Sequence, residues 1–153
     1  MNSTFTRVCK TENDLAIAII RIVLAAVMFA HVAQKMLGWF GGHGPSWTIE
    51  KWTGWFGLPG WVTALVIVGE FFGSILMLVG VGTRIMAFVT ALIMIGAVYF
   101  VHFRWGFYMN WYNEQGRGEG FEYHLLTMSM CIFLIMRGSG ALSFDRMLTN
   151  RKK

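Results

Sequence analysis

The sequence is poor in charge, with only 14% of its 153 residues being Asp, Glu, Lys or Arg. A soluble globular domain of ordinary composition carries about 25% charged residues. Hydrophobic residues make up 56% of the chain and give a mean hydropathy of +0.53. They are also gathered into blocks, so the composition favours an integral membrane protein over a soluble domain.

Cysteine is scarce, and its placement argues against redox or metal motifs. Cys9 lies in the polar N-terminal segment and Cys131 in an apolar block, so we expect no disulfide between them. No pair among the four histidines has i, i+4 spacing, so a metal centre is not predicted. No phosphate-binding Gly loop, dinucleotide fingerprint or nucleophile elbow is present either. The chain therefore has no recognisable nicotinamide or flavin module of its own.

The formal net charge of +5 does not indicate nucleic-acid binding. The Lys and Arg residues lie mainly at the ends of apolar blocks, and no basic stripe alternates with base-stacking aromatic residues. Charge at block ends is typical of membrane proteins, where it sets orientation. The expected partner is a lipid bilayer.

Four apolar blocks predict an all-α, four-transmembrane-helix bundle that forms a single membrane domain over residues 1–153. A spanning helix needs about 20 apolar residues. The fourth block is the weakest because Arg137 interrupts it, and it spans only if Arg137 reaches the headgroups and the helix continues to Leu142. The first block is too long for a secretory signal, so we expect it to be retained. The four predicted helices are residues 15–37, 61–81, 85–103 and 123–142.

The distribution of basic residues predicts the orientation of this bundle. Eight lie on the side of the termini and three on the side of the two long loops. The positive-inside rule then places both termini in the cytoplasm. The first group is Arg7, Lys10, Arg84, Arg137, Arg146, Arg151, Lys152 and Lys153, and the second is Lys51, Arg104 and Arg117.

All seven tryptophans fall on the predicted outer side, mostly in the long loop 38–60. They form either an aromatic belt at the headgroups or, since belts usually occupy both faces, a lid made by loops that fold back. In the second block, GEFFG at 69–73 places two glycines on one face for close helix packing.

Charged residues inside the apolar blocks point to a site. At 100° per residue, Arg21, His31 and Lys35 share one stripe of the first helix, which should face the bundle interior. The expected depths of the two residues in the membrane suggest that Arg21 pairs with Glu70 in the second helix. Such a pair either fixes helix register or handles protons.

A second group of polar residues is expected near the outer end of the bundle. Three of the predicted helices bring polar residues to a similar depth in the membrane. These residues are His31, Lys35, His102 and Glu122. Together they could bind a polar head group and exchange protons with it. The alternative is a set of interfacial residues wetted by headgroup water. We expect His43 and His124 to lie at the surface or interface.

With these residues placed, the chain resembles the DoxX family of small bacterial four-helix membrane proteins. The resemblance runs from Arg21 to Leu148, and its motifs are specific in their order and spacing. One departure is Ser139, where the family often has Pro, and we expect it to alter only a helix end. The matching stretches are RIVLAAVMFAHVAQKMLG, GLPGW, GEFFGSILMLVGVGTR, VHFRWGF, GEGFEYHLL and GSGALSFDRML.

The resemblance implies a multi-pass protein of the bacterial inner (plasma) membrane with a link to quinones and redox chemistry. Family members are named after a subunit associated with a terminal quinol oxidase and thiosulfate:quinone oxidoreductase, and others are linked to catechol, quinone, thiol or oxidative stress. The motif residues that carry over by position are Arg21, His31, Lys35, Glu70, Arg84, His102, Glu122 and Asp145.

Three functions are compatible with these observations. The first is a redox-associated protein in which His31, Lys35, His102 and Glu122 bind a quinone-like molecule, supported by Arg21 and Glu70. The second is a non-catalytic anchor or stabilising subunit of a redox or oxidative-stress complex. The third is a small transporter, for which a homo-oligomer would supply more helices. Whether the chain is itself an enzyme stays open.

Overall fold

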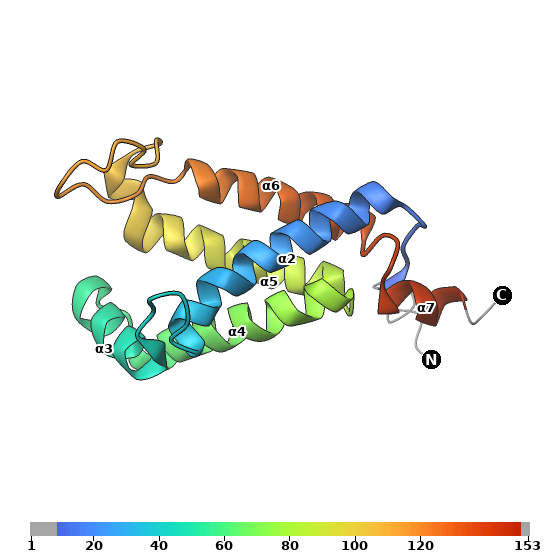
Figure 1. Ribbon diagram of the computed structural model, residues 1–153, viewed down its shortest axis with the longest axis horizontal. Helices are drawn as coiled ribbons and strands as arrows, with labels where there is room; N and C mark the ends of the chain where they lie inside the picture. The colour runs from blue at the N-terminus through green and yellow to red at the C-terminus, as the bar shows by residue number, and fades with distance from the viewer. Residues whose placement is uncertain (1–8, 151–153) are drawn as a thin grey trace.

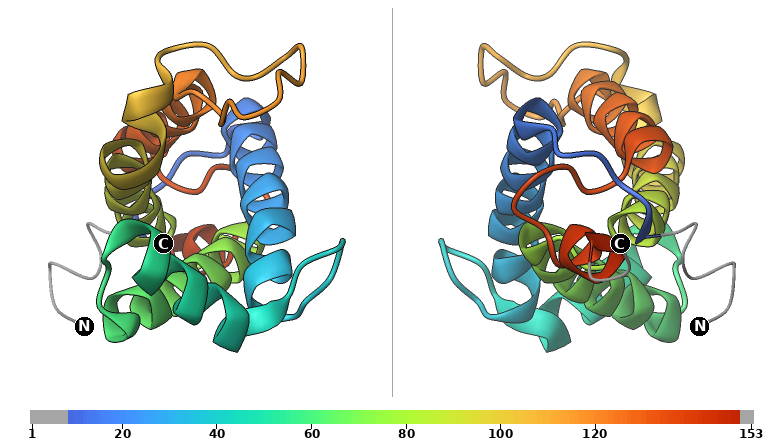
Figure 2. Two further views of the ribbon diagram at one scale, coloured as in Figure 1. Left: turned by 90° about the vertical axis from the view of Figure 1, so that its left-hand side faces the viewer. Right: turned by 90° about the vertical axis from the view of Figure 1, so that its right-hand side faces the viewer.

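The computed structural model describes residues 9–150, whose helices are joined by turns and loops and which contain no β-strand. Four long helices form an elongated bundle (Figure 1). Viewed along the bundle, these four helices occupy its four corners (Figure 2). They are α2 (Leu15–Met36), α4 (Gly60–Val79), α5 (Thr83–Ala97) and α6 (Glu122–Arg137).

Two short helices mark the two ends of the bundle. Helix α7 (Phe144–Asn150) lies at the end where α2 begins, which we call the terminal end (Figure 1). Helix α3 (Gly44–Phe56) lies at the opposite end, together with the long loop 106–121, and we call this the loop end. Of the basic residues assigned to the cytoplasmic side, Arg7, Arg151, Lys152 and Lys153 lie outside the described residues.

Three of the predicted membrane segments are confirmed. Helix α2, helix α4 and the continuous helical segment Thr83–Trp105 are long and apolar enough to cross a membrane. Their ends agree with the predicted ranges to within two residues. Large apolar side chains cover the outside of the bundle, as lipid contact requires, and Phe72 and Phe88 are each 54% exposed. The chain is therefore an all-helical membrane protein.

The segment Thr83–Trp105 changes its helix type before it ends. After Ala97 the α-helix passes into a π-helical turn, η1 (Val98–His102), and then a 3₁₀ turn, η2 (Phe103–Trp105). A π turn closes hydrogen bonds five residues apart and so widens the helix locally. His102 is the last residue of this widened turn.

The predicted extension of the fourth helix to Leu142 is wrong. Helix α6 ends at Arg137, because Gly138 and Gly140 adopt positive φ angles of 87° and 73° that turn the chain back across the bundle. The 16 residues of α6 make a helix about 24 Å long, whereas the hydrocarbon core of a bilayer is about 30 Å thick.

The loop predicted between the first two membrane segments contains a helix. Pro45 in the first turn starts α3, and Gly57, with a φ of 65°, ends it. The helix packs against α2 and α4.

The interior of the bundle is apolar toward the terminal end. Gly69 and Gly73 of α4 face α5, where an added Cβ at Gly69 would already touch Ile93 and Val89. This agrees with their predicted role in helix packing. The buried core consists of Ile17, Leu24, Ala25, Met28, Met77, Ala87, Met94, Cys131 and Leu134.

Candidate functional site

A cavity of about 510 Å³ lies at the loop end, between α2, α3, α4, α6 and the α5–η1 segment. This volume is within the range of about 300–1,000 Å³ that is typical of small-molecule sites. Most of its lining is apolar and aromatic. The apolar wall includes Trp52 and Phe56 of α3, Val62 and Val66 of α4, and Ile93, Ala97 and Phe100 of the α5–η1 segment.

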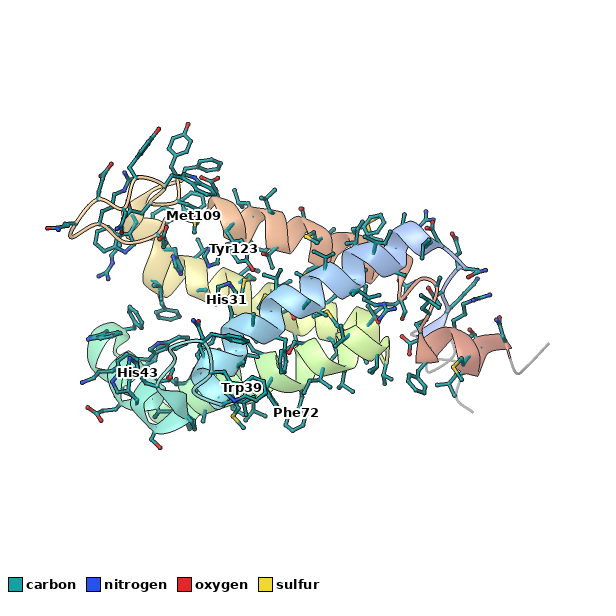
Figure 3. The ribbon with its side chains drawn as sticks, viewed as in Figure 1. His31, Trp39, His43, Phe72, Met109 and Tyr123 are labelled. Carbon is teal, nitrogen blue, oxygen red and sulfur yellow. The ribbon has the colours of Figure 1, made fainter. Side chains whose placement is uncertain are left out.

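The polar part of the lining comes from four helical segments and the loop 106–121. It contains three of the four residues predicted to cluster, namely His31, Lys35 and His102. In Figure 3 His31 and Tyr123 lie between the helices, and their ring centroids are 5.9 Å apart. The remaining polar lining residues are Glu70, Glu119, Tyr123 and His124.

A buried ion pair forms one wall of the cavity. The Lys35 ammonium of α2 donates to the Glu70 carboxylate of α4, and the two side chains are only 18% and 4% exposed. The Lys35 nitrogen also lies 5.3 Å from the centroid of the Trp52 ring, a cation–π distance. Trp52 of α3 thus lies over the pair on the side of the loop end.

The predicted Arg21–Glu70 pair is therefore wrong. Arg21 is fully buried, but the partners of its guanidinium are backbone carbonyls rather than a carboxylate. Two belong to the last turn of α4, whose carbonyls carry the negative end of the helix dipole, and the Met77 carbonyl also accepts from the Gly80 N–H at 3.0 Å. The other three belong to the turn after α6. The acceptors are Met77 at 2.7 Å, Leu78 at 2.6 Å, Ser139 at 2.7 Å, Ala141 at 3.2 Å and Leu142 at 2.9 Å.

Glu122, the fourth predicted member of the cluster, does not line the cavity. Its carboxylate accepts hydrogen bonds from the Met109 backbone N–H at 3.0 Å and the Trp111 indole N–H at 3.4 Å. Placed at the start of α6, it faces the donors of the preceding loop rather than the interior. Glu122 thus holds Met109, which does line the cavity, at the loop end (Figure 3).

Close packing reinforces this attachment of the loop 106–121. An added Cβ at Gly120 would lie 2.3–2.7 Å from three carbonyl oxygens of residues 106–108, so only glycine fits. A Cβ at Gly118 would likewise lie 2.5 Å from the Trp105 indole nitrogen. The loop therefore holds Glu119 at the cavity in a defined place.

His124 was expected at the surface, and this is wrong. It is only 6% exposed and lines the cavity, with its ring centroid 4.1 Å from that of His102. Its Nδ1 atom is buried without a hydrogen-bond partner. His124 shares one face of α6 with the buried residues Thr127, Cys131 and Leu134, and this face is turned toward the interior of the bundle.

The other predicted residues lie outside the cavity. His43 is exposed, as expected, and its ring is tilted against that of Trp47, with ring centroids 4.2 Å apart. Arg84 donates to the Ile135 and Met136 carbonyls at the end of α6. Asp145 accepts from the backbone N–H groups of Gly82 and Thr83, at 2.9 and 3.2 Å.

Ser139, the departure from the family pattern noted in the sequence, adds a contact at the terminal end. Its hydroxyl donates to Asp145, a bond that Pro could not make. The same carboxylate lies beside Cys9, and burial, followed by this negative charge, raises the pKa of the Cys9 thiol. These contacts tie the turn after α6 to the start of α5. Among residues 9–150, no three His, Cys, Asp or Glu side chains are grouped so that they could hold a metal ion.

Comparison with known proteins agrees with this architecture. The chain is 29% identical over 140 residues to "Putative oxidoreductase CatD" of Bacillus subtilis strain 168, covering 92% of each chain. No solved structure matches it. The family model named DoxX matches residues 16–103, which include α2, α3, α4, α5 and the π turn. More than half of the chain thus fits that model, and the protein belongs to the DoxX family.

Proposed function

We propose that this protein binds a quinone-like molecule, a planar ring bearing oxygen atoms, in the loop-end cavity, and that it takes part in redox chemistry at the membrane. The observation that carries the proposal is the combination of an apolar cavity between membrane helices with the Lys35–Glu70 pair in its wall. Buried ionisable groups in such places are costly and mark functional sites more often than packing.

The lining offers both surfaces that a quinone-like ring requires. Aromatic side chains, among them Trp52, Phe56 and Phe100, are available to stack on the ring. Quinone oxygens accept hydrogen bonds, which Lys35 and the imidazoles can donate, and quinol hydroxyls donate hydrogen bonds, which Glu70 can accept. The site is therefore suited to both the oxidised and the reduced form.

The side chains would also supply protons. Reduction of a quinone to a quinol adds two electrons and two protons, one proton to each oxygen. His31 and His124 are placed in the lining to donate protons and to be protonated again from water. The two electrons would come from a separate redox protein. The name of the Bacillus relative, an oxidoreductase, supports this class of chemistry.

A cavity-filling variant tests the proposal. Gly96 of α5 lines the cavity, and an added Cβ there meets no atom within 4 Å. Gly96→Phe should therefore fill the cavity without disturbing the helices. We expect the Kd for 2,3-dimethyl-1,4-naphthoquinone, measured by equilibrium dialysis in detergent, to rise at least about tenfold, since a stacked ring contributes about 1.5 kcal/mol.

The matched control is Gly54→Phe in α3. Gly54 also has open space around it, but it is absent from the cavity lining. Its Kd should equal that of the unaltered protein. Binding that survives Gly96→Phe unchanged would show that the ligand occupies another place, and the proposal would be wrong.

We further propose that α2, α4, the α5–η1–η2 segment and α6 all cross the plasma membrane, with both termini in the cytoplasm. The distribution of basic residues supports this orientation, since Lys10 and Arg84 flank the terminal end. Cysteines introduced at Tyr112 of the loop and Thr149 of α7 should react with a membrane-impermeant maleimide from opposite sides. Reaction of both from one side would mean that α6 does not cross.

A second candidate function is a membrane subunit that holds a redox complex together. It is favoured by the exposed aromatic residues of the loop, Tyr108, Trp111 and Tyr112, which are 67%, 73% and 89% exposed. Aromatic residues of this kind are enriched in protein interfaces. Purification in mild detergent should then yield a stoichiometric protein partner that is lost in a Trp111→Ala, Tyr112→Ala variant.

A further inference from the structure

We propose that protons reach the cavity from the loop end alone, by way of His102 and His124, and that the terminal half of the bundle is closed to them. The inference rests on the proposed function, because it concerns the protons that a bound quinone-like molecule would exchange. It assigns to His124 a role in proton transfer, and it states from which end of the bundle protons enter the site.

The geometry of the two histidines is suited to proton transfer. The Nδ1 atom of His102 lies 2.8 Å from the Glu119 carbonyl oxygen, and a carbonyl only accepts, so this nitrogen carries the hydrogen. The Nε2 atom of His102 is then left with a lone pair that can accept a proton. The ring of His124 lies next to it, with 4.1 Å between centroids, and presents a buried Nδ1 that has no partner.

The outer connection of this pair is Glu119. This residue is exposed and also belongs to the cavity lining, and its backbone carbonyl is the partner of His102, so Glu119 lies where solvent meets the site. The loop fixes its position, since the Glu119 carboxylate accepts from the Asn110 backbone N–H at 2.6 Å. The titratable groups that share the cavity with His124 are His31 and Lys35 of α2, Glu70 of α4, His102 of η1, Glu119 of the loop and Tyr123 of α6, whereas α3 contributes only Trp52 and Phe56.

The terminal half of the bundle offers no comparable route. Between the cavity and the terminal end, the four helices contain no Asp, Glu, His, Lys or Arg except Arg21; this holds for residues 22–30, 71–79, 85–101 and 125–136. The Arg21 guanidinium is committed to five backbone carbonyls. Guanidinium also keeps its proton at any physiological pH, so Arg21 cannot relay one.

Vesicles that contain the protein in one orientation test from which end protons enter the cavity. The protein is reconstituted with its C-terminal tag enclosed, so that the loop end faces outward, and the Kd for 2,3-dimethyl-1,4-naphthoquinone is measured. One compartment is held at about pH 7 while the other is varied from about pH 6 to about pH 8, the ordinary range of histidine. We expect the Kd to rise with the outer pH by up to about tenfold per unit, because one linked proton helps to hold the quinone oxygen. The inner pH should have no effect.

Three variants complete the experiment. His124→Gln and His102→Gln should each weaken binding and flatten the dependence of the remaining Kd on outer pH. His43→Gln, a histidine outside the cavity, should leave both the Kd and its dependence on outer pH as they are in the unaltered protein. A Kd that follows the inner pH, or a dependence on outer pH that persists in both cavity variants, would overturn the inference and leave the proposed function standing. Absence of binding at every pH would instead contradict the proposed function, and the inference would fall with it.

Discussion

The two ends of the bundle solve the same physical problem in different ways. Each holds a cationic side chain of α2 inside an apolar environment. At the terminal end Arg21 is surrounded by backbone carbonyls, and at the loop end Lys35 is paired with the Glu70 carboxylate beside a cavity. A carbonyl cannot be protonated, whereas a carboxylate can. The first arrangement is therefore fixed, and the second is able to respond to protons or to a ligand.

The comparison predicts its largest effect at Arg21. Arg21→Met removes all five donated hydrogen bonds and leaves buried carbonyls without partners, which should lower the free energy of unfolding by about 5 kcal/mol or prevent folding. Arg21→Lys keeps the charge but not the planar fork, so the loss should be about 3 kcal/mol. Thermal unfolding in detergent measures both.

Arg137 provides the control for Arg21. Its guanidinium pairs with Glu12 at 2.8 Å, but the two side chains are 46% and 69% exposed. An exposed pair contributes at most about 1 kcal/mol, so Arg137→Met should have little effect. Equal losses from the two variants would mean that the carbonyl cage is not what stabilises the terminal end.

The next largest effect is expected at the Lys35–Glu70 pair. Lys35→Met leaves a buried carboxylate without its partner, which should cost about 3 kcal/mol. The double variant Lys35→Met, Glu70→Leu should recover most of that loss, since apolar replacements of buried pairs are often neutral, while ligand binding should be lost. A double variant as unstable as the sum of the two single variants would show that the two side chains are not coupled, and the assignment of a buried ion pair would be wrong.

A smaller effect is expected at Asp145, whose carboxylate caps the first N–H groups of α5. Asp145→Ala should cost about 1–2 kcal/mol, as for other N-terminal caps, and leave quinone binding unchanged. At the loop end Glu122→Gln should have the reverse profile, with little loss of stability and weaker binding, because the loop above the cavity is loosened. Chemical unfolding and equilibrium dialysis on both variants separate the two profiles.

The smallest effect concerns the reactivity of Cys9 rather than stability. Burial and the neighbouring Asp145 raise the pKa of this thiol, so less thiolate is present at neutral pH than for a free cysteine. Maleimide labelling of Cys9 in the folded protein should be slow and should accelerate by about tenfold per pH unit up to that raised pKa. Mass spectrometry locates the label. Labelling as fast as in the unfolded chain would mean that this part of the terminal end is open.

The sequence predicted three membrane helices closely because each is a continuous apolar block of spanning length. It did not predict the end of α6, because Ala141 and Leu142 resume the apolar block after Arg137, while the positive φ angles of Gly138 and Gly140 end the helix before them. The partner of Arg21 was missed for a related reason. A search among side chains cannot find carbonyls that are exposed only once the chain has turned.

The candidate site was predicted in part. His31, Lys35 and His102 were placed at the correct end by depth, because each lies near the same edge of an apolar block. Glu70 was paired with Arg21 instead of Lys35, because the choice of partner depends on how α2 and α4 are staggered. His124 and Tyr123 required the orientation of α6, which a short block with few polar residues defines poorly.

The π turn at Val98–His102 has a consequence for the history of this protein. A π turn corresponds to one residue inserted into an α-helix. Deleting a single residue there would narrow the wide turn to an α-helical one and change the position of His102 relative to His124, while the residues beyond the turn would keep nearly the same faces. Whether a relative can place a histidine at this position thus depends on the length of the segment as well as on its composition. A sequence alignment of two such proteins that leaves out this one-residue difference in length would hide the difference in the position of the histidine.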